Sequence, residues 1–171
     1  MVYQKSIQSE SGRTMLEMLG VLGIMGIIMY GAVAGINYGM NTYKVNQVYT
    51  EVQEAIQGIE DLYSWSSKYT EDINKYATDP ANEIFVRGCQ SGADAQCKNA
   101  FDGSITVAQR CSGRSFKIIY VGVPQSECER LQEMEWGTVV MQATCAANSD
   151  IYFCPRTKSS QNGCSDQPTD C

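Results

Sequence analysis

A run of 26 residues, from Met18 to Tyr43, contains no charged side chain. As an α-helix this run spans about 39 Å, more than the roughly 30 Å of hydrocarbon in a bilayer. Its most apolar part ends near Ile36, and Asn37 and Asn41 mark where polar side chains return. The run therefore predicts a helix that crosses a membrane.

Basic residues flank this apolar segment on both sides. Lys5 and Arg13 precede it, and Lys44 follows it directly. Lys and Arg are enriched on the cytoplasmic side of membrane helices. The count favours a cytoplasmic N-terminus, although Lys44 weakens the bias, and places the rest of the chain on the other side of the membrane.

The cysteines lie in the last 83 residues of the chain. No two have the C-x2-C spacing of a zinc knuckle, and the sequence contains no His. These facts favour disulfides in an oxidising compartment over metal binding, and we expect no cofactor. The eight residues are Cys89, Cys97, Cys111, Cys128, Cys145, Cys154, Cys164 and Cys171. Cys89 and Cys97 would close a short loop if they pair.

Charge and composition argue against some classes of function. The net charge is -6, from 13 basic and 19 acidic residues, and the acidic excess lies after residue 43. This balance argues against nucleic-acid partners. Without His, the chain lacks Ser-His and Cys-His nucleophilic sites, and its glycines have no phosphate-binding spacing. We expect no enzyme, and we interpret the acidic cluster Glu127, Glu129, Glu133 and Glu135 as a solvated helix face.

One acidic residue, Glu17, directly precedes the apolar segment. An Asp at the centre of a membrane helix costs about 2.5–3.5 kcal/mol on insertion scales, so the presence of a carboxylate here has to be explained. A simple membrane anchor does not explain it. A secretory signal peptide does not explain Glu17 either, although the stretch AVAG offers a cleavage site after Ala34.

The residues around Glu17 resemble a known signature. The stretch SGRTMLEMLGVLGIMGII is similar to the prepilin signature of type IV pilins and type II secretion pseudopilins. In that family a prepilin peptidase cuts after a Gly, the new terminus is usually N-methylated, and a Glu stands fifth in the mature chain. Gly12 matches the leader Gly, Arg13 would become the terminus, and Glu17 matches the acid. Arg13 stands where Phe, Met or Leu is more usual.

This resemblance implies a membrane protein that assembles. Its partners would be the prepilin peptidase, the assembly machinery of the bacterial inner membrane and other pilin subunits. The subunit would cross the inner membrane once and then join an extracellular pilus used in adhesion, conjugation or secretion. The alternative is a secreted, disulfide-rich binding domain with a signal peptide cleaved after Ala34.

Glu17 gains a physical role in such a filament. Cleavage after Gly12 would create an α-amino group, whose pKa is usually about 8. Glu17 of one subunit can pair with that amine on a neighbour, which offsets the cost of burying a carboxylate. A local Arg13–Glu17 pair is the alternative, and it contributes only a few tenths of a kcal/mol.

A second apolar pattern follows the membrane segment. Its period is helical, so one helix is expected from about Thr14 to Lys68, with a separate helix after a loop near Gly39 as the alternative. A second row, Tyr49, Ile56 and Tyr63, is expected to cover a sheet together with Trp65. The stripe consists of Val45, Val48, Val52, Ala55, Ile59 and Leu62.

The rest of the chain reads as loops and short strands. Residues 70–113 are rich in turn formers, with one strand expected at Ser104–Ala108. A short helix is expected in GVPQSECERLQEMEWG. Further strands are expected at Phe116–Val121, Thr138–Gln142 and Asp150–Phe153.

These patterns predict an α+β fold, with a long N-terminal helix packed on a small antiparallel sheet and a disulfide-rich C-terminal region. The expected parts are a leader (1–12), an apolar assembly helix (13–43), its amphipathic continuation (44–68) and a globular domain (69–171).

The C-terminal half carries a looser resemblance. The run FKIIYVGVPQSECERL and the later C-x5-IYF are similar to type IVb pilins related to plasmid-borne conjugative pili. That resemblance implies a Cys128–Cys145 disulfide and a terminus held down by Cys171.

Overall fold

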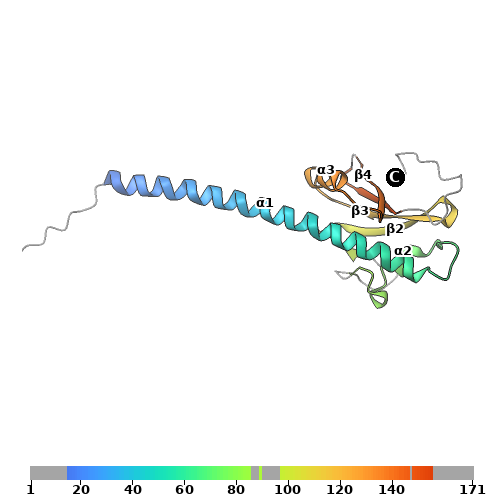
Figure 1. The fold of residues 1–171 in the computed structure, drawn as a ribbon. Helices are drawn as coiled ribbons and strands as arrows, with labels where there is room; N and C mark the ends of the chain where they lie inside the picture. Colours follow the sequence, from blue (N-terminus) through green and yellow to red (C-terminus); the bar gives the residue numbers. More distant parts are fainter. Residues whose placement is uncertain (1–14, 86–88, 90–96, 147, 156–171) are drawn as a thin grey trace, which may run out of the picture. The chain divides into compact units, whose positions relative to one another are not determined.

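The computed structural model describes residues 15–85, 89, 97–146 and 148–155. The chain divides into two compact units, one ending at Met40 and the other beginning at Asn41. Helix α1 (Met15–Leu62) contributes residues to both (Figure 1). It runs through Gly39 without a loop, so the prediction of one continuous helix is confirmed.

Helix α1 ends earlier than the expected Lys68. Three serines follow Leu62 within five residues, and serine side chains compete for backbone hydrogen bonds. Ser66 Oγ donates to the Lys68 carbonyl oxygen at 2.6 Å. The Tyr69 N–H then donates to the Gly113 carbonyl at 2.7 Å, which commits the chain to a turn towards the sheet.

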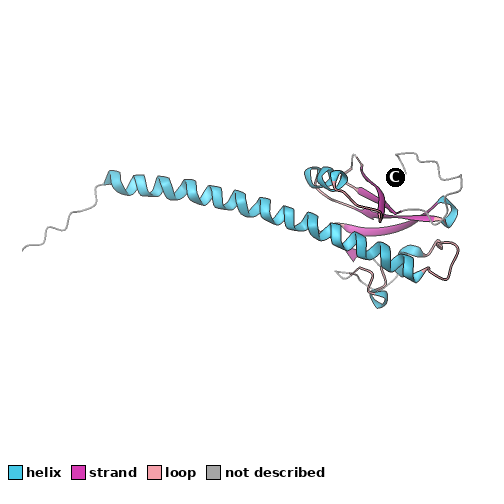
Figure 2. Cartoon of the chain, viewed as in Figure 1, coloured by secondary structure: helices cyan, strands magenta, loops and turns pink. Residues whose placement is uncertain are grey.

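The second unit contains a five-stranded antiparallel sheet with the order β1-β2-β3-β5-β4. Figure 2 draws the strands in magenta. This arrangement with α1 confirms the predicted α+β fold. The strand expected at Thr138–Gln142 begins two residues later and runs to Cys145, and β1 was not expected. The strands are β1 (Cys97–Lys98), β2 (Ser104–Arg110), β3 (Ser115–Tyr120), β4 (Val140–Cys145) and β5 (Ile151–Pro155).

Short helices precede the sheet and connect some of its strands, and some of them lie where the sequence indicated loops. The expected helix is α3 (Gln125–Glu133), while α2 (Ile73–Ala77) and the 3-10 turn η1 (Pro80–Asn82) are additions. A second 3-10 turn, η2 (Cys111–Gly113), joins β2 to β3. Helix α2 is held by a tertiary contact, because Asn74 Oδ1 accepts a hydrogen bond from the Val107 N–H at 2.8 Å. Such a tertiary contact stabilises a helix that is too short to be stable in isolation.

The predicted stripe of α1 is buried except at its end. Leu62 is 42% exposed, and Ile56 from the second row is buried instead. Trp65 is 99% exposed, so the expectation that it covers the sheet was wrong. Leu62 is the last residue of α1 and Trp65 lies in the turn after it, so both lie at or beyond the end of the helix. The buried residues of α1 are Val45, Val48, Val52, Ala55, Ile56 and Ile59.

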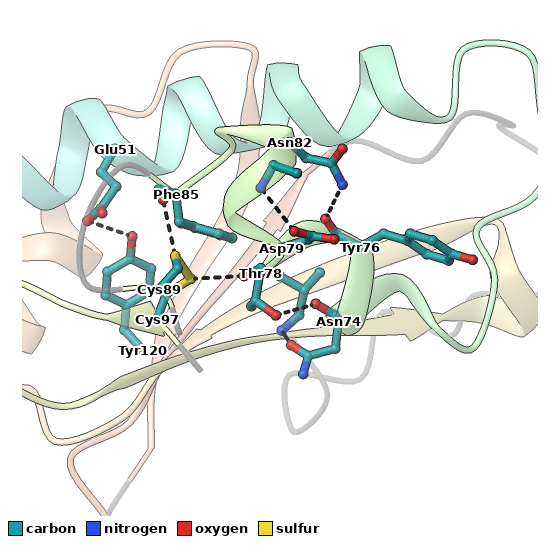
Figure 3. The surroundings of a disulfide bond; sticks show 12 residues. Glu51, Asn74, Tyr76, Thr78, Asp79, Asn82, Phe85, Cys89, Cys97 and Tyr120 are labelled. Carbon is teal, nitrogen blue, oxygen red and sulfur yellow. Dashed lines mark hydrogen bonds between the residues drawn. A yellow bond between two sulfur atoms is a disulfide. The ribbon is translucent and has the colours of Figure 1, made fainter. Parts of the chain in front are cut away.

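Aromatic rings and one polar contact join α1 to the sheet. Tyr49 lies 4.9 Å from Trp136 between ring centroids, and Trp136 lies 4.9 Å from Phe153 of β5. The Tyr120 hydroxyl of β3 donates to Glu51 Oε2 at 3.1 Å (Figure 3). Burial, and after it the charge and hydrogen bond of Glu51, raise the pKa of Tyr120 well above its usual value.

Tyr69 makes the unit sensitive to alkali. Burial, and after it the charge of Glu60, raise the pKa of Tyr69 from 10.0 to about 12. The stability that depends on its neutral phenol is complete below pH 10.0 and is lost as pH rises through about 12. Tyr69→Phe should therefore lose less stability than the native chain across this range, as measured by urea unfolding.

The matched control is Tyr76→Phe, because Tyr76 is 45% exposed. This control should follow the native pH dependence. An unchanged alkaline slope in Tyr69→Phe would contradict the assignment.

Candidate assembly site

The described part of the first unit, residues 15–40, is a helix that is apolar on all sides apart from Glu17 and Asn37. Every side chain from Met15 to Asn41 is exposed. An 18-residue window of α1 has a mean hydropathy of 2.1, so by length and composition the helix can cross a membrane. A helix that is apolar on all sides is normally buried in lipid or among other helices.

Glu17 lies in the first turn of α1, with its side chain exposed. A carboxylate in the first turn is favoured by the partial positive charge of the helix N-terminus. Gly12 and Arg13 lie outside the described residues. Cleavage after Gly12, and the pairing of Glu17 with a new amine, therefore stay predictions.

The glycines of this unit have room for side chains. A Cβ added at Gly31, Gly35 or Gly39 would meet no atom within 4 Å. Each glycine costs helix stability, about 1 kcal/mol relative to Ala. Close packing inside a single copy does not require them, whereas helix packing against neighbours in a membrane favours small residues at such a spacing.

Side-chain contacts hold the first residues of α1 that belong to the second unit. Asn41 Nδ2 donates to Glu127 Oε1 at 2.9 Å, and Arg130 Nη1 donates to Thr42 Oγ1 at 3.5 Å. Lys44 Nζ lies 5.6 Å from the centroid of the Phe101 ring. We call this group, Asn41, Thr42, Lys44, Phe101, Glu127 and Arg130, the junction.

The prediction that all four acidic residues form a solvated helix face was wrong for Glu127, which is buried. Glu129, Glu133 and Glu135 are exposed, but Glu127 is only 5% exposed. Its second oxygen accepts a hydrogen bond from Ser126 Oγ at 2.5 Å. It also lies in the first turn of α3, where the helix dipole favours negative charge.

Sequence reasoning missed the junction because its main contact joins residues 86 positions apart. A local signal did exist in part, since acidic residues are enriched in the first turn of a helix and Glu127 lies in the first turn of α3. Nothing local indicates that Asn41 supplies a donor to that carboxylate.

Disulfides hold the loops of the second unit. Cys89 pairs with Cys97 (Figure 3), and Cys128 pairs with Cys145, the pair implied by the resemblance. Cys111 and Cys154 are also disulfide-bonded. Cys164 and Cys171 lie outside the described residues. Among the residues that the structure describes, no group of three or more acidic or Cys side chains is placed to hold a metal ion.

A family model described as the PilS N-terminal domain matches residues 42–169. The chain belongs to this family. As a PilS-family member it is a pilus-related protein. The match begins one residue after the start of the second unit, so it is independent of the prepilin-like residues around Glu17. No curated protein and no solved structure gives a significant match.

The Cys128–Cys145 disulfide joins α3 to β4 across 17 residues of this PilS-family unit, against 8 residues for Cys89–Cys97. Closing the longer loop restricts the unfolded chain more. Replacing Cys128 and Cys145 together by Ala should lower the free energy of unfolding by about 3 kcal/mol, measured by urea unfolding in detergent.

The matched variant, with Cys89 and Cys97 replaced by Ala, should lose about 0.5 kcal/mol less. A larger loss from the shorter loop would show that loop closure does not control these contributions.

Proposed function

We propose that this protein is a structural subunit of a type IV pilus or a similar filament and acts by assembly rather than by catalysis. The observation that carries the proposal is the exposed apolar surface of residues 15–40, on the same helix that enters a PilS-family unit. Lipid covers this surface before assembly, and the helices of neighbouring subunits cover it afterwards.

Glu17 directs the assembly step in this proposal. The prepilin peptidase removes residues 1–12 and leaves an α-amino group on Arg13. Away from water, an unpaired carboxylate is strongly disfavoured, so Glu17 of an incoming subunit selects the position where it meets the amine of its neighbour. The exposed position of Glu17 in the first turn of α1 supports such a contact.

Glu17→Ala should separate insertion from assembly. The variant keeps the apolar helix, so its amount in the membrane fraction should equal that of the native protein. Filaments, counted by electron microscopy, should be lost because the docking position is no longer selected. Normal filaments from Glu17→Ala would contradict the proposed role.

Glu10→Ala is the matched control for this variant. Glu10 is an acid of the leader, which the peptidase would remove. The control should therefore assemble like the native protein.

The mature N-terminus distinguishes this function from that of a secreted binding domain. Mass spectrometry should find a chain that begins at Arg13, in cells with the prepilin peptidase and not in cells without it. The same spectrum reports any N-methylation. A chain that begins at Gly35 regardless of the peptidase would identify a cleaved signal peptide and overturn the filament proposal.

A further inference from the structure

The apolar face of α1 does not by itself fix the position of α1 along its axis in the second unit. Pulling on the N-terminal half would move α1 towards its own N-terminus. After a shift of four residues, five of the six buried sites would still receive an apolar or aromatic residue. The incoming residues would be Tyr49, Val52, Ile56, Ile59, Glu60 and Tyr63, with Glu60 as the exception.

Polar contacts distinguish the observed register from the shifted one. In the shifted register Val45 would replace Asn41, and Glu127 Oε1 would lose its donor. Ala55 would replace Glu51 opposite the Tyr120 hydroxyl. Leaving a buried carboxylate without its partner is strongly destabilising, and a polar contact inside an apolar interface can select one register.

Glu127 is suited to this role by its burial. It is 5% exposed, and among the residues that the structure describes it is the one charged side chain in the buried class. Cys128, the next residue, ties α3 to β4, so the carboxylate is presented from a helix that is anchored to the sheet.

We propose that Glu127 is a positioning residue that fixes the register of α1 in the second unit. Through this register it sets the length of apolar helix available to the membrane and the filament. A shift of four residues would lengthen that helix by about 6 Å. The statement about register stands on the junction alone, and the statement about length rests on the proposed function.

The chain carries a natural probe for the register. It has two tryptophans. Trp136 is 6% exposed and its ring lies 4.9 Å from Tyr49, whereas Trp65 is 99% exposed. The four-residue shift would place Gln53 where Tyr49 meets Trp136. The indole N–H signal of Trp136 in an NMR spectrum therefore reports the register, and that of Trp65 is an internal reference.

The experiment compares full-length variants in detergent micelles. The native chain and Glu127→Gln, which keeps an oxygen acceptor for Asn41, should each give one Trp136 signal. Glu127→Leu should give at least two, from two registers, while the Trp65 signal stays unchanged. The control Glu129→Leu changes an exposed acid of the same helix and should give one signal. A single Trp136 signal from folded Glu127→Leu would overturn the proposal.

A double variant, Asn41→Leu with Glu127→Leu, decides the matter even where the single variant does not fold. An apolar pair can restore the stability that a broken polar pair loses. Two Trp136 signals from this folded variant would show that the apolar pair restores stability but does not restore a single register, as proposed. One signal would mean that the contact only stabilises the fold, and would overturn the proposal.

Filaments from Glu17→Ala would refute the assembly mechanism and leave the Trp136 result unchanged.

Discussion

The packing of residues 45–59 of α1 against the sheet is the contact on which the second unit depends. It buries six side chains of the helix, and burial of each large apolar side chain contributes about 1.5–3 kcal/mol before the entropy of ordering is subtracted. The same helix continues through residues 15–40, where every side chain is exposed. One continuous element therefore serves two environments, and the change between them occurs within the few residues at the junction.

Local patterns predicted α1 and most strands because these elements repeat over many residues. The period of the stripe identified Val45, Val48 and Val52 correctly, and runs of strand-forming residues identified β2 and β3. The error at Leu62 came from extending the buried stripe to the last residue of α1, whose side chain is 42% exposed. A repeating pattern shows which face is apolar, but not how far the surface that covers it extends.

The elements that were missed depend on distant partners. Helix α2 has five residues, and its Asn74 binds a backbone group 33 positions later. The burial of Glu127 depends on Asn41, which looked like the end of an apolar segment. Glu17 shows the opposite limit. It is recognisable from sequence because its neighbours repeat a known spacing, but the partner proposed for it belongs to another copy of the chain.

The strand order has a consequence for the synthesis of the protein. β5 is the last strand of the described sheet, and it lies between β3 and β4. The sheet therefore cannot close until Pro155 has been made, although α1 is complete at Leu62. At typical rates of translation the intervening segment takes roughly 5 to 20 seconds. Throughout that delay the valine stripe of α1 has no finished surface to cover it, so the chain exposes an aggregation-prone apolar face until β5 has been made.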